Sequence, residues 1–223
     1  HVGHYVKLLM DEVFGEGNFQ REIIWDLGNP SGYKSLAENW IRGHDTILYY
    51  SKGNKFVFNK LYISYSKKDL KNYPEKINRK GLAITDVWKD INSAQKWGKG
   101  KIEHTGFETE KPRALLERII KASSNSDDLV LDCFIGSGTT ARVAQKLGRR
   151  WIGCDINKGA IQMTSRELQK IILEQVKENK TKYPSFATYQ VNNYDLQLLR
   201  TEAIELAVQH IGIQRTKTDS FFD

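Results

Sequence analysis

Two carboxylates and two glycines occupy positions from which they can bind a nucleotide-like molecule. Asp132 ends a short apolar run just before Gly136 and Gly138, and Asp155 follows the next apolar run along the chain. Glycines at such positions let the backbone turn sharply and approach a ligand closely. A carboxylate after the second run is placed to accept hydrogen bonds from ribose hydroxyls. These residue types at this spacing predict a nucleotide-binding loop.

The elements that must position these residues are a strand, a glycine loop, a helix and a second strand. Residues 129–131 are consecutive apolar residues, which favours a parallel strand covered on both faces. Thr139 and Thr140 are predicted to cap the helix that follows. Residues 150–156 predict the second strand, with Asp155 at its end. This order is typical of an α/β nucleotide-binding half-fold.

The loop alone does not choose between cofactors. Residues 136–141 also satisfy the G-x-G-x-x-A pattern of dinucleotide-binding folds, so an NAD-dependent oxidoreductase stays open. Two observations favour S-adenosylmethionine. Asp132 would repel a pyrophosphate, whereas a carboxylate there suits the amino group and sulfonium of S-adenosylmethionine. The unit also begins about halfway along the chain, while a dinucleotide fold usually opens with it.

Three separated motifs carry a resemblance to a known family. Lys111 and Pro112 precede an amphipathic helix, DCFIGSGTT follows at residues 132–140, and RRWIGCDIN follows at residues 149–157. This order resembles the permuted (β-class) amino-DNA methyltransferases, which methylate adenine N6 or cytosine N4 and include the type III modification subunits. Further matching segments extend the resemblance over nearly the whole chain: residues 5–15, 18–25, 43–52 and 82–90.

The resemblance implies a circularly permuted, Rossmann-like α/β fold with a mostly parallel sheet, in one domain over residues 1–223. It implies transfer of a methyl group from S-adenosylmethionine to DNA, most simply to adenine N6, in a restriction-modification system or by an orphan methylase. The implied partner is double-stranded DNA with its target base flipped out. A homodimer or a restriction subunit stays open, and no metal site is expected. The cofactor-binding residues implied are Lys111, Pro112, Asp132, Phe134, Gly136, Ser137, Gly138, Thr139, Thr140, Asp155 and Asn157.

The chain departs from the family pattern in three places. Cys133 stands where the family usually has Pro, and Glu110 where it usually has Gln. Glu110 is expected to make the carboxylate-binding side of the cofactor site more negative. The family's catalytic Asp-Pro-Pro-Tyr or Asn-Pro-Pro-Tyr does not occur, so no catalytic residue is assigned. We expect a fragment that is inactive alone, with an unpaired edge on the strand at residues 129–132. A degenerate remnant that binds cofactor or DNA without catalysis is the alternative.

The amino-acid composition limits the kinds of molecule that the chain is expected to bind. Lys and Arg number 34 against 27 Asp and Glu, which gives a net charge of +7 and favours an anionic partner such as DNA. Residues 53–104 interleave basic and aromatic residues, which suggests an insertion for DNA target recognition or aromatics packed in a small core of their own. No apolar run is long enough for a membrane span and no secretory signal is visible, so a cytoplasmic protein is expected.

Five further expectations concern local structure. Cys133 and Cys154 are predicted to be small buried core residues. His44 and Asp45 are interpreted as strand-entry residues rather than an acid–base pair. The remaining predictions cover the C-terminal part of the chain: a helix through residues 165–177, a strand at 186–191 and a helix at 194–211.

Overall fold

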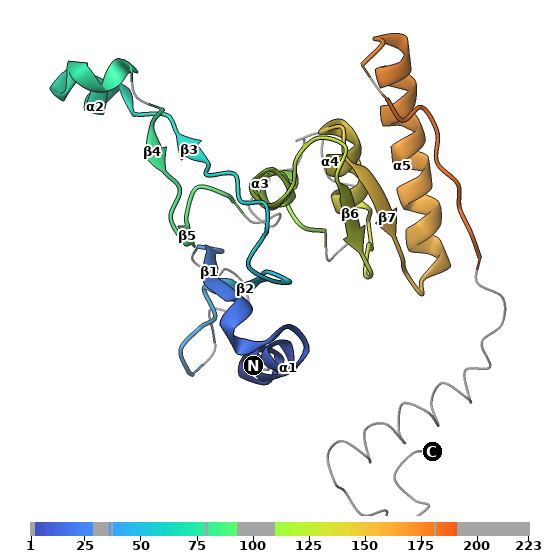
Figure 1. Ribbon diagram of the computed structural model, residues 1–223, viewed down its shortest axis with the longest axis horizontal. Coiled ribbons are helices and arrows are strands. Elements are labelled where there is room, and N and C mark those ends of the chain that lie inside the picture. Colours follow the sequence, from blue (N-terminus) through green and yellow to red (C-terminus); the bar gives the residue numbers. More distant parts are fainter. Residues whose placement is uncertain are drawn as a thin grey trace, which may run out of the picture. The chain divides into compact units, whose positions relative to one another are not determined.

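A computed structural model gives the protein an α/β architecture (Figure 1). It describes residues 3–28, 36, 38–78, 80–92, 110–180 and 182–190. The contacts within the chain divide it into two compact units, His1–Ser185 and Phe186–Asp223. Residues 186–190 form neither helix nor strand, so the strand predicted there is wrong, and the helix predicted at 194–211 lies outside the described residues. No helix in the described ranges combines the length and apolarity needed to cross a membrane.

The N-terminal part is a helix followed by an antiparallel pair of strands. Its elements are α1 (Gly3–Phe14), the 3-10 turn η1 (Glu16–Asn18), β1 (Phe19–Asp26) and β2 (His44–Tyr50). A short strand, β5 (Val87–Trp88), adds to β1 in parallel, which gives the sheet order β2-β1-β5. Because β2 begins at His44, the strand-entry interpretation of His44 and Asp45 is confirmed.

Residues 53–86 contain short elements with mostly exposed side chains. They are β3 (Tyr62–Ile63), α2 (Lys67–Asn72), η3 (Pro74–Asn78) and β4 (Leu82–Ala83). Helix α2 begins with a capping box, in which the Ser66 hydroxyl accepts from the Asp69 amide and the Asp69 carboxylate accepts from the Ser66 amide, each at 3.1 Å. Three exposed lysines, called the α2 lysines, lie on this helix: Lys67, Lys68 and Lys71.

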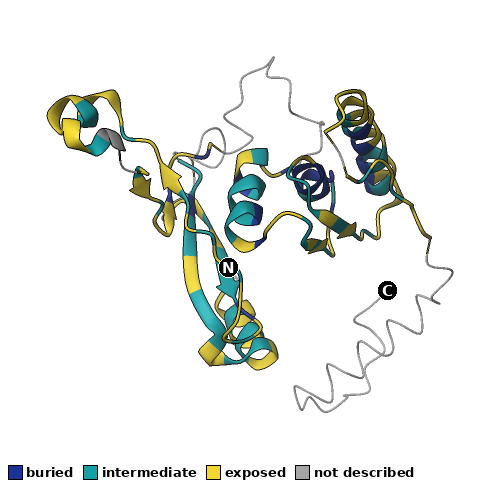
Figure 2. Ribbon diagram, turned by 45° about the horizontal axis from the view of Figure 1, so that its top comes forward, coloured by how far each residue is buried: buried dark blue, intermediate teal, exposed yellow. Residues whose placement is uncertain are grey.

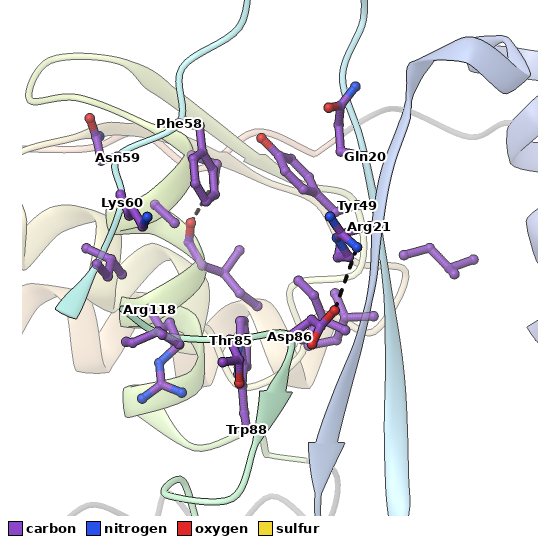
Figure 3. Close-up of a pocket in the computed structure, with 18 of the residues that line it drawn as sticks. Gln20, Arg21, Tyr49, Phe58, Asn59, Lys60, Thr85, Asp86, Trp88 and Arg118 are labelled. Carbon is purple, nitrogen blue, oxygen red and sulfur yellow. Dashed lines mark hydrogen bonds and ion pairs between the residues drawn. The ribbon is translucent and has the colours of Figure 1, made fainter. Parts of the chain in front are cut away.

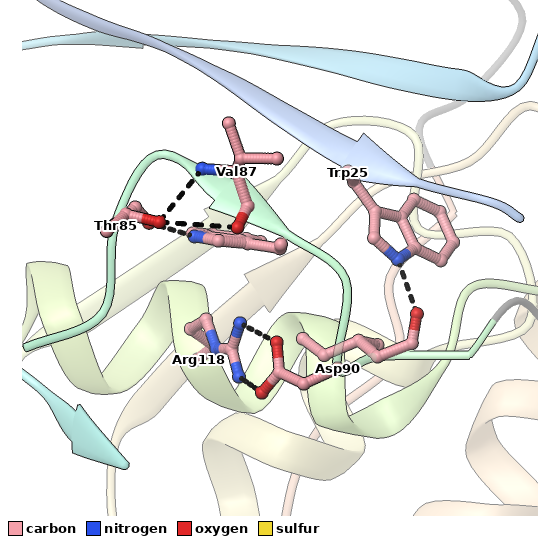
Figure 4. Close-up of polar contacts among 7 residues, drawn as sticks. Trp25, Thr85, Val87, Asp90 and Arg118 are labelled. Carbon is pink, nitrogen blue, oxygen red and sulfur yellow. Dashed lines mark hydrogen bonds and ion pairs between the residues drawn. The ribbon is translucent and has the colours of Figure 1, made fainter. Parts of the chain in front are cut away.

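Helix α3 (Arg113–Ser123) packs against the first sheet and supplies Leu115 to a core that also contains Trp25, Trp88 and Ile91. Polar contacts hold the tryptophans in place (Figure 4). The indole N–H of Trp25 donates to the Ile91 carbonyl at 2.8 Å. Arg118 of α3 pairs with both oxygens of Asp90, and its guanidinium lies 5.0 Å from the Trp88 ring centre. The amphipathic helix predicted after Pro112 is therefore confirmed.

The remaining elements follow the predicted strand, loop, helix and strand order: β6 (Leu129–Asp132), α4 (Thr139–Lys146), β7 (Arg150–Gly153) and α5 (Lys158–Lys177). Strands β6 and β7 pair in parallel, and Ile120, Val143 and Ala144 form the core beneath them. The coverage expected on both faces of β6 is wrong, because Leu129 and Leu131 are exposed. Most residues of α4 are buried, and Figure 2 colours the ribbon by burial. Within the described ranges β6 pairs with β7 and no other strand.

Both cysteines are exposed, so their predicted burial is wrong. Cys133 is the first residue after β6 and Cys154 the first after β7. An apolar run in the sequence does not reveal where its strand stops. Each cysteine therefore lies beyond the packed layers, at the carboxyl end of its strand.

Candidate functional site

Asp132 joins the two ends of the glycine loop. Its Oδ1 accepts a hydrogen bond from the Phe134 amide at 3.0 Å, and its Oδ2 accepts from the Thr140 hydroxyl at 2.6 Å. The carboxylate thus ties the turn after β6 to the first turn of α4. The prediction that Thr139 and Thr140 cap α4 is wrong, since Gly138 occupies the N-cap position and no side chain caps it. The Thr140 hydroxyl donates to Asp132 instead.

Asp155 joins the same loop to the start of α5. Its Oδ2 accepts from the Gly136 amide at 2.8 Å and its Oδ1 accepts from the Asn157 amide at 2.8 Å. Asn157 in turn caps α5, because its side-chain oxygen accepts from the amides of Gly159 and Ala160. A carboxylate oxygen has two lone pairs, so each oxygen of Asp155 retains one acceptor position for a ligand hydroxyl.

Helix α5 explains why residue 138 must be glycine. Gly138 has a φ of +79°, a region that L side chains rarely adopt. A Cβ built at this position would lie 2.5 Å from the Thr164 side chain. Thr164 also donates a hydrogen bond from its hydroxyl to the Gly136 carbonyl at 3.0 Å. The position that a Cβ of residue 138 would occupy is therefore taken by the Thr164 side chain.

A buried polar network lies beneath the loop. The guanidinium of Arg142 on α4 is 2.6 Å from the Glu110 carboxylate, and the two side chains are only 6% and 1% exposed. The same Arg142 Nη2 lies 3.2 Å from the Thr139 hydroxyl, which lies 3.2 Å from the Ser137 hydroxyl. The network connects the residue before Lys111 to the centre of the glycine loop.

This network corrects the expectation for Glu110. The carboxylate does not add negative charge to the cofactor side, because Arg142 neutralises it at hydrogen-bonding distance. Sequence reasoning missed Arg142. The available signal was a single charged residue within the small apolar stretch Ala141, Val143 and Ala144.

Lys111 and Pro112 lie at the start of α3. Pro112 is fully buried and occupies the N-cap position. The Lys111 ammonium lies 3.0 Å from Asp45 Oδ2 and 5.4 Å from the Trp25 ring centre, so its contacts are with β1 and β2. Partial burial raises the pKa of Asp45, but Lys111 and Arg42 lower it, and the net result is a pKa below the usual value.

Two apolar side chains beside the carboxylates are almost fully exposed. Phe134 follows Asp132 in the loop and is 90% exposed, and Ile156 follows Asp155 and is 95% exposed. Sequence reasoning included Phe134 and missed Ile156. The site thus combines two hydrogen-bond-accepting carboxylates with two uncovered apolar side chains. Such a combination suits a ligand that has a hydroxylated sugar, a flat apolar ring and a cationic group.

A separate pocket of about 580 Å³ lies between the first sheet and α3, and none of the predicted cofactor residues lines it (Figure 3). Phe56 and Phe58 line it, and their ring centres lie 6.2 and 6.1 Å from that of Tyr49 on β2. Both rings remain partly exposed, at 44% and 57%, and their partner Tyr49 lies outside residues 53–104, so they do not form a core of that segment's own.

A model of the DNA methylase family N6_N4_Mtase matches residues 1–166. The chain belongs to this family. Among curated DNA methylases it is 42% identical over 153 residues to the type II methyltransferase M1.MboII of Moraxella bovis, covering 62% of this chain and 58% of the relative. It is 40% identical over 169 residues to M.HpaI of Haemophilus parainfluenzae, covering 74% and 49%. The chain therefore spans about half the length of the curated relatives it matches.

Solved DNA methylase structures share the fold. The M1.HpyAVI–SAM complex superimposes with a TM-score of 0.53 at 25% identity, covering 75% of this chain and 69% of that one. The cytosine-N4-specific PvuII DNA methyltransferase matches at a TM-score of 0.50 and 17% identity, covering 80% and 64%, which supports the α/β fold alone.

Proposed function

We propose that this chain forms the cofactor-binding part of a DNA methyltransferase that uses S-adenosylmethionine to methylate an exocyclic amine of a DNA base, most simply adenine N6. The observation that carries the proposal is the cluster made by Asp132, the glycine loop and Asp155, in a chain of the DNA methylase family. The M1.HpyAVI relative was solved with SAM, which supports the same cofactor here.

The residues present fit this cofactor. The free acceptor positions of Asp155 suit the two ribose hydroxyls, and the exposed side chains of Phe134 and Ile156 suit the faces and edge of an adenine ring. Asp132 supplies a negative charge for the amino group and sulfonium. Lys111 is proposed to pair with the cofactor carboxylate, in exchange for part of its contact with Asp45. When bound, S-adenosylmethionine supplies an electrophilic methyl group on a good leaving group.

The proposed substrate is double-stranded DNA. The net charge of +7 supports contact with phosphates, and the target base must leave the stack to reach a methyl donor. The relatives named above are type II methyltransferases, which favours an enzyme of that type over a type III modification subunit. The proposal also includes a permuted order of the family motifs, and it leaves open a restriction partner or a homodimer. That residues 1–223 alone do not transfer a methyl group stays a prediction, motivated by the missing Asp-Pro-Pro-Tyr motif.

Two other functions are weighed against this one. The family match over residues 1–166 counts against an NAD-dependent oxidoreductase. A remnant that binds cofactor or DNA without catalysis is favoured by one observation, the missing catalytic motif. The remnant and the methyltransferase share the cofactor site and differ in turnover.

Calorimetric titration of the folded chain with S-adenosylmethionine and with NAD tests the cofactor. Binding of the first and not the second is expected. Asp155→Ala should weaken binding by about 1.5–3 kcal/mol, the scale of hydrogen bonds to a charged acceptor. Glu167→Ala, which removes a half-buried carboxylate on α5, is the matched control and should leave the affinity unchanged. Equal affinity in a folded Asp155→Ala variant would remove Asp155 from the site.

A further inference from the structure

Trp40 is the most exposed large hydrophobic side chain among the described residues, with 99% of its surface open to solvent. The two next most exposed, Ile156 and Phe134, belong to the cofactor site described above. Trp40 lies elsewhere, in the loop that connects β1 to β2, and Leu36 and Ile41 of the same loop are exposed as well. An isolated exposed hydrophobic residue is ordinary. The residues near Trp40 nevertheless indicate a role in binding.

The loop is fastened to the residues that lead into the cofactor site. Two residues after Trp40, the side chain of Arg42 donates to the His44 carbonyl at 3.0 Å and forms an ion pair with Asp45. The other oxygen of Asp45 lies 3.0 Å from the Lys111 ammonium. Contacts therefore connect Arg42, two residues after Trp40, to Lys111 through Asp45. If Lys111 binds the cofactor as proposed above, the base that receives the methyl group comes to this part of the protein.

An exposed cationic side chain lies two positions from Trp40. Arg42 and Lys111 share a single carboxylate, Asp45, and Glu38 adds a second carboxylate to this part of the loop. Arg42 remains largely exposed and available to a phosphate. A fully exposed indole close in sequence to an exposed guanidinium can stack on bases while the guanidinium contacts the backbone. An apolar side chain that enters between bases also lowers the cost of unstacking them.

We propose that Trp40 enters the base stack of the DNA beside the target base and occupies the space that the flipped base leaves. This inference rests on the proposed function and adds to it a residue that stabilises the opened duplex. Trp40 contacts no cofactor atom in this proposal. Its loss should weaken the binding of opened DNA and leave S-adenosylmethionine binding intact.

The test compares two short duplexes of identical sequence, one fully paired and one with a single abasic position. An abasic position provides the space in advance, so the 223-residue chain should bind that duplex more tightly. Trp40→Ala should lose about 5- to 150-fold in affinity for the abasic duplex, the range corresponding to one stacked base. Trp40→Phe retains a stacking ring and should recover most of the loss. Tyr189→Ala, which removes another exposed ring, is the matched control and should bind as the unaltered chain does.

Fluorescence anisotropy gives the two affinities, and calorimetry with S-adenosylmethionine is run on the same samples. The proposal is overturned if Trp40→Ala binds both duplexes as the unaltered chain does, if the unaltered chain does not distinguish them, or if Tyr189→Ala loses as much. A chain that binds S-adenosylmethionine and fails to favour the abasic duplex refutes the role of Trp40 and leaves the cofactor assignment standing. A chain that favours the abasic duplex through Trp40 and binds no S-adenosylmethionine refutes the cofactor assignment alone.

Discussion

The buried pair of Glu110 and Arg142 gives the sharpest stability prediction. Replacing Arg142 with Met keeps much of the side-chain volume and removes the ion pair that Arg142 forms with the Glu110 carboxylate, which is only 1% exposed. Removing one partner of a buried ion pair costs about 3–5 kcal/mol. The Thr139 hydroxyl also loses its contact with Arg142, which adds about 1 kcal/mol. The free energy of unfolding of Arg142→Met should therefore fall by about 4–6 kcal/mol.

The reciprocal variant, Glu110→Gln, restores the residue usual in the family. Its amide oxygen can still accept from Arg142, so the hydrogen bond survives while the compensating charge is lost. The double variant Glu110→Gln with Arg142→Met has no buried charge at this position. It should be more stable than either single variant, because an apolar or neutral replacement of a buried pair is often close to neutral.

Urea unfolding of the four proteins measures the coupling directly. A matched control is the exposed pair of Glu167 and Lys170 on α5, whose atoms approach to 2.7 Å. Lys170→Met should change the stability by no more than about 0.5 kcal/mol, as expected for a surface pair. If the costs of the two single variants at Glu110 and Arg142 simply add in the double variant, the two side chains do not stabilise each other and the reasoning fails.

Three further predictions use other contacts. Gly138→Ala should lower the stability by about 1–3 kcal/mol through its positive φ and its clash with Thr164, while Gly17→Ala, whose Cβ meets open space, should be neutral by thermal melting. Because its pKa is lowered in the folded state, Asp45 stabilises the protein above about pH 4 and loses this effect as the pH falls through the folded pKa. Asp45→Asn should therefore lower the melting temperature at neutral pH and converge with the unaltered protein in strong acid; a constant difference at all pH values would contradict this. Replacing the three α2 lysines with Ala should reduce the slope of log K against log [salt] for DNA binding by up to about 2.7, and an unchanged slope would show that they touch no phosphate.

The cofactor half of the fold could be predicted from the sequence because its signals are local. The apolar run before Asp132, the glycines and the second run before Asp155 fix a strand, a turn and a strand within a short stretch of chain. The amphipathic pattern of residues 113–123 likewise predicts α3 without knowledge of its partner. These elements depend on periodicity and turn chemistry, which one sequence shows directly.

The failures concern contacts between residues far apart in the chain. Glu110 and Arg142 are separated by 32 positions, and nothing in either neighbourhood signals the other. Thr140 was predicted to cap α4. Its hydroxyl instead donates to Asp132 at the end of the preceding strand, a contact that the local sequence does not reveal. The burial of Leu131 was inferred from an apolar run, whereas burial depends on which layers cover the strand. The periodicity of a sequence predicts which face of an element a side chain lies on, but it does not identify the residue that the side chain contacts.

The contact between Gly138 and Thr164 limits how this sequence can diverge. A larger residue at position 138 requires a smaller one at 164, yet the first step toward a smaller residue removes the hydrogen bond from Thr164 to the Gly136 carbonyl. Either substitution made first lowers stability, so the two positions can change together far more readily than one at a time. Selection for a folded protein alone would then retain Gly138 in a descendant that had stopped binding cofactor. Retention of Gly138 in a related sequence would therefore indicate packing against α5 and would not by itself indicate an active enzyme.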